Sequence, residues 1–454
     1  MKKVMLMLII ICILGSFAGG CVPVQQNNQE THTDIKKAEH VTGEYLTDYH
    51  LSLPEDYVGT LTMWGWDDSY YRAVTEAFKK KYPNVTFEYT NVANGDLVNK
   101  YQTALAIGGE LPDIAWAIVD SRAQVFALDM WEPLDQEPYN FDISEIFEYL
   151  HPQMINEKGE VCGIEQSISP AGLAYRKDLA KKYLGTDNLE ELEEMLSDWD
   201  DFIEKGREVY QKSDGQVYMF RGLGDVQVFI REQGGEAWIA GNEIRVTDAL
   251  EYSINRTGEF RDNNIVDNLE SWSLSWYQSF GGEQHIFAGY ATWSLAMVIE
   301  PYDIEGHQKG HWGLMSAPEG NISWGGTTMG ITKTCEDKRL AWEFIKFATL
   351  STEGAEAINA IGLMTSAVKP YQENPALGSY ESSWFGEQDL GKYFLEEIIP
   401  NIKTRPINKD DNVIHEVLNL VSTALNNDPL LSSAEVVELL KKELSERLPD
   451  YEVK

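Results

Sequence analysis

Three strand patterns decide the fold of this chain: TLTMWGWDD at residues 60–68, VTFEY at 85–89 and IAWAIVD at 114–120. Between the first two, apolar side chains recur at helical spacing from Tyr71 to Phe78. A second helix is predicted from Asp96, its expected N-cap, to Gly108. The order strand, helix, strand, helix, strand predicts a doubly wound α/β fold.

Polar groups follow two of these strands. Trp66, Asp67 and Asp68 come directly after the first strand, and Asp120 follows the third. Ligands of open α/β sheets bind outside the carboxyl ends of the strands. These two loops are therefore the first candidates for a binding site.

Size and charge limit the function classes. A chain of 454 residues is long for one core, so two lobes are expected. Its 43% hydrophobic and 11% aromatic content is ample for a folded protein. The formal net charge of -36 would repel a phosphate backbone, which argues against nucleic acid as a partner.

Cysteine and histidine usage argues against metal and disulfide chemistry. Cys162 and Cys335 are the two cysteines in the body of the chain, far apart and without C-x-x-C spacing. They could pair, but two separate buried thiols are favoured. The eight histidines never fall into a ligand pattern. No metal site, cofactor or catalytic motif is predicted.

The N-terminus resembles a bacterial lipoprotein signal. Lys2 and Lys3 precede an apolar run too short to span a bilayer, and Ala18-Gly19-Gly20 leads to Cys21. Ala18 departs from the leucine usual at its position, and an ordinary cleaved signal is the alternative. The interpretation gives a signal peptide over 1–20, a lipid anchor on Cys21 and a flexible tether over 21–55. The protein would then be held at the outer face of the cytoplasmic membrane of a bacterium, of Gram-positive type.

The later sequence suggests chain crossings and a helical C-terminal part. Small and polar residues over 163–175 suit a crossing between lobes, and 217–220 is taken as a strand. A second crossing is expected near 312–318, followed by a small-residue strand over 324–331. Helices are predicted over 340–350, 385–399, 412–425 and 433–448.

Seven motifs, taken in their order and spacing, resemble the extracellular solute-binding proteins (family 1) of ABC carbohydrate importers, in the class of maltose-binding protein. Two departures are Glu165, where the family usually has proline, and Arg176, where it has asparagine. The motifs are Leu111-Pro112-Asp113-Ile114, Cys162-Gly163-Ile164, Leu173 to Leu179, Trp199-Asp200-Asp201-Phe202, Trp312 to Pro318, Trp324 to Ile331 and Trp342 to Phe347.

This resemblance implies an α/β fold of the two-lobe, periplasmic-binding-protein type (type II), with discontinuous lobes. The N-lobe would comprise 55–164 plus 313–349, and the C-lobe 170–310 plus 352–450. Hinge strands would lie at about 164–170, 310–313 and 349–352. A monomer would hold its ligand between the lobes, and closure would present it to the permease subunits of the importer.

The resemblance also carries over candidate sugar contacts in the first lobe. Aromatic rings stack on the apolar face of a pyranose, and carboxylates accept hydrogen bonds from its hydroxyls. Asp120 is the main polar candidate, with a helix N-cap for 121–127 as its alternative. Asp67 and Asp68 come next, although one of them should cap the following helix. Trp66 is favoured as a stacking ring, whereas Trp64 is favoured as a core residue.

Further candidates lie in the second half of the chain. The family places contacts in the loop that contains Arg221 and Asp225, and in the strand that ends at Trp293, where methionine is expected. Ser169 stands where relatives can carry a carboxylate, so that contact should be changed. The remaining stacking candidates, each also a core candidate, are Trp324 and Trp384.

The predicted function is capture of a carbohydrate, an oligosaccharide, for delivery to an ABC importer. Two alternatives stay open: a cationic or peptide ligand on the same scaffold, which the acidic loops would suit, and an extracellular glycosidase with two carboxylates. The sugar, its linkage and its length are not determined by the sequence.

Overall fold

The computed structural model describes residues 53–308 and 310–454. The predicted signal peptide, the Cys21 anchor and nearly all of the predicted tether lie outside the described residues. The three strand patterns near the start of this part form β1 (Gly59–Gly65), β2 (Val85–Asn91) and β3 (Ile114–Ile118), as predicted.

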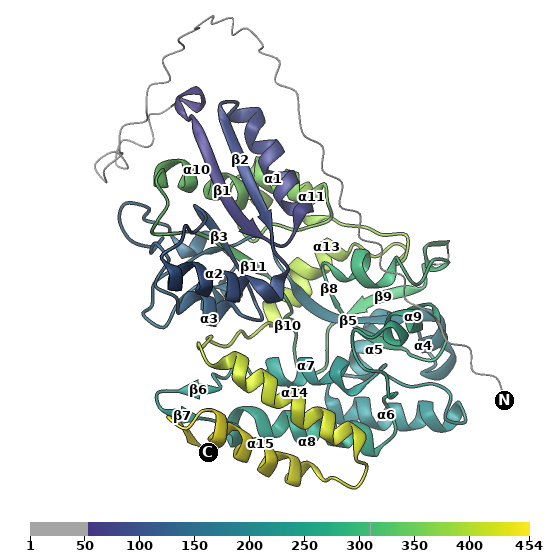
Figure 1. Cartoon of the computed structure of the whole chain (residues 1–454). Helices are drawn as coiled ribbons and strands as arrows, with labels where there is room; N and C mark the ends of the chain where they lie inside the picture. The colour runs from purple at the N-terminus through teal and green to yellow at the C-terminus, as the bar shows by residue number, and fades with distance from the viewer. Residues whose placement is uncertain (1–52, 309) are drawn as a thin grey trace, which may run out of the picture. The chain divides into compact units, whose positions relative to one another are not determined.

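The first sheet has five strands in the order β2-β1-β3-β11-β4 (Figure 1). Both β2 and β3 pair with β1 in parallel. Antiparallel neighbours complete it: β11 (Thr327–Ile331) pairs with β3, and β4 (Ile164–Glu165) pairs with β11. The carboxyl ends of β1 and β3 therefore lie at the same edge, where the loops with Trp66 and Asp120 begin.

Alternation along β3 explains how helices cover both faces of this sheet. Ile114 and Trp116 pack in the core beneath α1 (Asp68–Lys81) and α10 (Lys338–Leu350). Ala115 and Ala117 face α2 (Leu97–Ile107) and α3 (Arg122–Phe126). Gly108 ends α2 with φ 63, as predicted, but the Asp96 side chain makes no capping hydrogen bond. Both predicted helices are confirmed, and Asp96 stands at the predicted N-cap position of α2 without a capping bond from its side chain.

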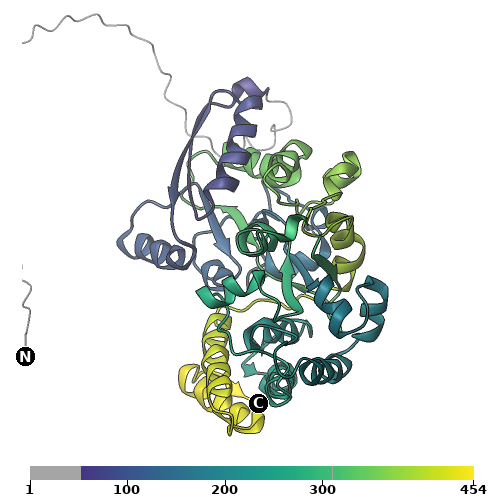
Figure 2. The ribbon, with the colours of Figure 1, turned by 90° about the vertical axis from the view of Figure 1, so that its right-hand side faces the viewer.

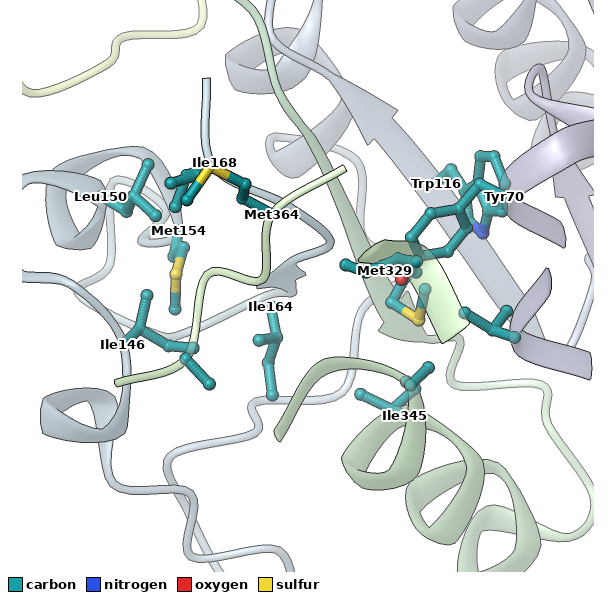
Figure 3. Close-up of a cluster of buried hydrophobic side chains, with 14 of the residues drawn as sticks. Tyr70, Trp116, Ile146, Leu150, Met154, Ile164, Ile168, Met329, Ile345 and Met364 are labelled. Carbon is teal, nitrogen blue, oxygen red and sulfur yellow. The ribbon is translucent and has the colours of Figure 1, made fainter. Parts of the chain in front are cut away.

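The second sheet is built around β5 (Pro170–Arg176), all of whose residues are buried. It pairs antiparallel with β8 (Phe287–Ala291), β9 (Trp312–Met315) and β10 (Ile322–Ser323). Between the sheets, the chain passes through an apolar cluster that includes Ile164, Ile168 and Met364 (Figure 3). The predicted crossing over 163–175 contains the connection from β4 in the first sheet to β5 in the second, and its role as a hinge between lobes stays a prediction.

The return crossing lies later than predicted. Because β9 and β10 pair with β5, the chain returns to the first sheet only between Ser323 and Thr327, and not at 310–313. Gly325 and Gly326 there have φ values of +111 and +114, which side chains with a Cβ rarely adopt. These two glycines interrupt the strand that was predicted over 324–331.

The position of α11 (Thr352–Asn359) also differs from the prediction, which assigned the chain from residue 352 onward to the second lobe. It packs against α1 and α10, and Lys81 of α1 pairs with Glu353 at 3.0 Å. The chain therefore stays beside the first sheet beyond 349–352. The division of the whole chain into lobes remains a prediction.

Helices dominate the remaining structure, and α14 and α15 lie side by side at its C-terminal end (Figure 2). The predicted strand at 217–220 is wrong, since Tyr218 and Phe220 form only isolated bridges. The other elements are α4 (Lys177–Tyr183), α5 (Leu189–Met195), α6 (Trp199–Lys212), α7 (Leu223–Glu232), α8 (Glu251–Asp262), α9 (Leu274–Gln278), α12 (Lys369–Glu373), α13 (Leu390–Tyr393), α14 (Asp411–Asn427), α15 (Ser433–Arg447), β6 (Ile239–Ala240), β7 (Glu243–Ile244) and β12 (Glu452–Val453).

Two further observations bear on the sequence predictions. Cys162 and Cys335 are free and buried, so the expectation of two separate thiols is confirmed. Over 53–308 and 310–454, no helix combines the length and hydropathy that a membrane crossing requires.

Candidate ligand-binding site

A cavity of about 900 Å³ lies where the end of β3, α7, the 268–276 loop and α14 meet. Its volume falls at the upper end of the range usual for ligand pockets. The residues around it are Asp120, Leu223, Gly224, Asp225, Gln227, Val228, Arg231, Asn268, Leu269, Glu270, Ser271, Trp272, Trp276, Trp324, Asn412, His415, Glu416, Asn419, Ser422, Thr423, Asn426 and Asn427.

Asp120 brings a carboxylate from the first sheet to this cavity. It follows β3 directly, and the N-cap of α3 is Ser121, so the alternative role of Asp120 as a helix cap is wrong. Within the described part of the chain, its carboxylate accepts no hydrogen bond from the protein. Burial raises its pKa, while the guanidinium groups of Arg231 and Arg122 oppose that shift. The oxygens of Asp120 are thus available to a ligand.

Aromatic rings form one wall of the cavity. The ring of Trp272 is 49% exposed, and its backbone has φ 69, a strained value for a bulky residue. Trp276 packs beside it with ring centroids 5.1 Å apart, and Trp324 lies 6.1 Å away. The exposed ring of Trp272 is the only one of these three that is free to stack broadly on a ligand.

Asp225 holds this aromatic wall in place. Its carboxylate accepts hydrogen bonds from Nε1 of Trp276 at 2.9 Å and from Oγ of Ser271 at 3.0 Å. Burial raises its pKa, and the hydrogen bond from Trp276 and the charge of Arg221 oppose the shift. Asp225 therefore lines the cavity, but its oxygens already bond to Ser271 and Trp276, and its role as a ligand contact stays a prediction.

α14 provides the facing wall, with amide and hydroxyl side chains. Asn412, Asn419, Thr423 and Asn426 recur along it at spacings that place them on one face of the helix. The opposite face, with residues such as Val417 and Leu418, is buried in a separate core with α15. Helical amphipathicity thus presents the polar side of α14 to the cavity.

A buried network of charges lies beneath one end of the cavity. Arg405 bonds to Glu232 at 3.1 Å and to Asp411 at 2.6 Å, and Arg231 bonds to Glu232 at 3.0 Å. Burial alone would raise the pKa of Glu232, but Arg405 and Arg231 outweigh it and lower the pKa to about 2. Burial, with Arg231 nearby, lowers the pKa of His415 to about 3, so its imidazole is neutral at pH 7.

The first loop of predicted contacts does not line this cavity. Asp67 caps α1 by accepting hydrogen bonds from the backbone N–H groups of Ser69 and Tyr70. Asp68 pairs with Arg72 on the same helix. Nε1 of Trp66 donates to Oγ1 of Thr327 at 3.1 Å, so its indole is tied to β11. Structural contacts thus account for all three, and their role as ligand contacts stays an untested prediction.

Three other candidates also have structural partners. Arg221 is buried, bonds to Oγ of Ser279 at 2.9 Å, and lies 3.6 Å over the ring of Phe280. Nε1 of Trp293 donates to the Trp324 carbonyl, and Nε1 of Trp384 donates to the Asp303 carbonyl, both at 2.9 Å. None of the three lines the cavity, whereas Trp324 does.

Sequence reasoning missed Trp272 and the polar face of α14. The segment Ser271-Trp272-Ser273, a tryptophan between two small polar residues, is a usable signal for an exposed ring. The alternating apolar and amide-rich faces over 412–427 could likewise have indicated a helix that borders a polar cavity. In the described ranges, no group of three or more His, Cys, Asp or Glu side chains could hold a metal ion.

Comparisons with known proteins give a consistent result. The family model described as bacterial extracellular solute-binding protein matches residues 73–379. A lactose-binding protein of Rhizobium radiobacter is 24% identical over 320 residues, which cover 67% of this chain and 65% of the relative's own length.

Solved structures show the same fold. An extracellular solute-binding protein of family 1 has a TM-score of 0.77 at 18% identity, over 86% of this chain and 99% of the other. The galacto-N-biose/lacto-N-biose I-binding protein of an ABC transporter from Bifidobacterium longum has a TM-score of 0.70 at 16% identity, over 87% and 99%. The predicted two-lobe α/β fold of type II is therefore confirmed.

Proposed function

Because the chain belongs to the bacterial extracellular solute-binding proteins, we propose that it captures a carbohydrate in the cavity beside Asp120 and delivers it to an ABC importer. The observation that carries this proposal is the composition of the cavity. One wall contains the exposed ring of Trp272, and the facing wall contains the amide and hydroxyl groups of α14. Asp120 lines the cavity from the end of β3.

Each of these groups suits one surface of a sugar. The flat ring of Trp272 can cover the apolar face of a pyranose at little cost in rotamer entropy. Asp120 can accept hydrogen bonds from two hydroxyls, and charge-assisted bonds of this kind are the stronger ones. Amides such as Asn419 both donate and accept, as a hydroxyl does. Relatives described as lactose-binding and lacto-N-biose-binding support a carbohydrate ligand.

The proposed cellular location rests on the family and on the N-terminal signal. The family is extracellular by description, and we propose that acylated Cys21 holds the protein at the outer face of the membrane. In this arrangement a monomer would collect the ligand outside the cell and pass it to the permease subunits. Labelling with a radioactive fatty acid, which Cys21→Ala should abolish, tests the anchor.

Acidic residues favour one other ligand class. Asp120, Glu270 and Glu416 line the cavity, so a cationic ligand such as a polyamine would be attracted. Against this, Arg231 also lines the cavity, the carboxylate of Asp225 is already bonded to Trp276 and Ser271, and apart from Glu416 the residues of α14 that line the cavity are uncharged. A neutral sugar can pair with more of the side chains that line the cavity than a cation can.

A thermal-shift panel of neutral saccharides, polyamines and peptides tests the proposal. A bound sugar should raise the melting temperature by mass action and should change the tryptophan fluorescence. Asp120→Ala should weaken binding roughly 10- to 100-fold, because it removes charge-assisted hydrogen bonds. Asp187→Ala is the matched control, since its exposed carboxylate pairs with Lys181 and does not line the cavity. Stabilisation by polyamines alone, or equal effects of the two variants, would contradict the proposal.

A further inference from the structure

A side cavity of about 110 Å³ adjoins the main cavity at Asp120. Asp120, Arg231 and His415 line both cavities. The other walls of the side cavity come from the start of α3, from β10 and from the start of α14. Its volume has room for a few water-sized groups, so it can hold a substituent of a sugar but not a whole ring.

Oxygen atoms without partners gather around this side cavity. Oγ of Ser121, Oγ of Ser323 and Oδ1 of Asp411 are buried, belong to residues that line it, and have no hydrogen-bond partner within the described ranges. The side chain of Asp411 is only 8% exposed, and its other oxygen, Oδ2, accepts from Arg405 at 2.6 Å. A buried acceptor without a donor lowers stability, so these oxygens indicate that a group rich in donors fills the side cavity.

The charges beside the side cavity leave Asp120 in excess. Arg231 and Arg405 are balanced by Glu232 and Asp411, because these four side chains form one buried network of ion pairs. Arg231 also acts on the carboxylate of Asp120 at longer range, but its guanidinium already bonds to Glu232. Asp120 itself forms no ion pair in the part of the chain that the structure describes. A cation would therefore complete the charge balance.

Three groups of the main cavity are compatible with a cation near Asp120. The side chain of Glu270 is exposed and makes no ion pair among the described residues. The exposed ring of Trp272 presents a π face, which attracts positive charge. Burial, with Arg231 nearby, lowers the pKa of His415 to about 3, so this imidazole adds no opposing charge at pH 7.

A protonated amino group matches these features better than a hydroxyl group does. An ammonium has three donors and no acceptor, which suits a cavity with several unpartnered oxygens. A hydroxyl donates a single hydrogen bond and would leave most of those oxygens unpaired. A polyamine also has enough donors, but it has no ring to stack on Trp272 and no hydroxyl groups for the polar face of α14.

We infer that the ligand is an amino sugar, whose protonated amino group enters the side cavity. This group donates hydrogen bonds to Asp120, to Oδ1 of Asp411 and to a serine hydroxyl of the side cavity. The inference rests on the proposed carbohydrate function and adds the chemical class of the sugar.

Pairs of sugars that differ only by an amino group in place of a hydroxyl test this inference. The pairs are glucosamine and glucose, galactosamine and galactose, mannosamine and mannose, lactosamine and lactose, and the mixed fragments of chitosan and of cellulose. The simple hexoses are also tested with the amino group on the exocyclic carbon. Native mass spectrometry identifies the retained pair, and calorimetry then measures both dissociation constants. We expect the amino form to bind at least about 10-fold more tightly, the effect of charge-assisted hydrogen bonds.

Asp120→Asn is the decisive variant, because it keeps the size and one carbonyl acceptor but removes the charge. We expect it to bring the ratio of the two dissociation constants down to about one. Ser121→Ala removes one unpartnered oxygen from a residue that makes no capping bond, and should lower the ratio roughly 3-fold. Asp187→Asn is the matched control: its exposed carboxylate pairs with Lys181 away from both cavities. An unchanged ratio in this control separates the local effect of Asp120 from the attraction of a protein with net charge -36.

The outcomes separate the two proposals. Equal affinity for the amino and hydroxyl forms, or a preference that survives Asp120→Asn, overturns the amino-sugar assignment and leaves the carbohydrate function standing; ordered water then fills the side cavity. Binding of neither form of any sugar overturns the carbohydrate function and this inference with it.

Discussion

Replacing Arg122 tests the buried ion pair that lies near Asp120, at the carboxyl end of β3. Arg122 pairs with Glu165 at 3.0 Å, and the exposed fractions of their side chains are 0% and 1%. Arg122 also bonds to Oε1 of Gln153 at 3.2 Å. It follows Asp120 closely in the chain, while Glu165 lies in β4 where the chain leaves the first sheet. Arg122→Met keeps much of the volume but leaves the Glu165 carboxylate buried without its counter-ion.

The cost can be worked out from proton binding. Burial raises the pKa of Glu165 even beside Arg122, whose charge opposes the shift. Without Arg122 the buried carboxyl would take up a proton, so the free energy of protonating a carboxyl whose unfolded pKa is 4.5 is an upper limit on the penalty. At pH 7 this is about 2.5 pH units at 1.36 kcal/mol each, or about 3 kcal/mol. At pH 5 the same calculation gives about 0.7 kcal/mol. The variant should therefore be strongly destabilised at pH 7 and only slightly at pH 5.

Urea unfolding of both proteins at the two pH values measures this difference. Glu165→Gln is the contrasting single variant: it leaves a permanently charged Arg122, so its penalty of about 3 to 5 kcal/mol should not depend on pH in this range. The double variant Arg122→Met/Glu165→Leu removes both charges and should recover most of the loss. A penalty for Arg122→Met below about 1 kcal/mol at pH 7, or one equal at both pH values, would refute the reasoning.

Two other predictions concern the charge network beneath the cavity and the aromatic wall. The folded pKa of Glu232, about 2, lies below its unfolded value of 4.5, so its stabilising effect is present above pH 4.5 and is lost as the pH falls toward 2. Urea unfolding between pH 5 and 2.5 should show this loss, and Glu232→Gln should flatten the slope. Trp272→Gly relieves the strain at φ 69 and removes the exposed ring. Calorimetry should show roughly 3- to 10-fold weaker sugar binding with nearly unchanged stability, whereas unchanged affinity would exclude stacking on Trp272.

Local patterns predicted much of the first sheet and its helices. Period-two alternation over 60–64 and 85–89 and the apolar run after Pro112 all became strands, because neighbouring residues alone decide which face is buried. Helices α10, α14 and α15 were predicted within a few residues for the same reason. At 217–220 the structure has isolated bridges from Tyr218 to His285 and from Phe220 to Val266 in place of the predicted strand, although the backbone of this segment also bonds to Phe287 at the start of β8.

Local sequence could predict the position of some candidate contacts but not of others. Asp120 reached the cavity because a strand end has a defined position in a parallel sheet. Asp67 instead caps its own helix, a role that competes with ligand binding wherever an aspartate precedes a helix. Arg221 and Trp293 are occupied by residues far away in the chain, which no local pattern reveals.

The amino-acid sequence by itself determined the strand and helix order, the absence of a cysteine framework and the family resemblance, since these depend on spacing and residue type. The tertiary structure alone decided which polar groups remain available. It brought Trp272, Asp120 and the amide face of α14 together from segments about 150 residues apart in the chain. The reason is that a side chain is available to a ligand only when no hydrogen-bond or packing partner within the protein already occupies it. The tertiary structure determines which residues lie close enough to be such partners.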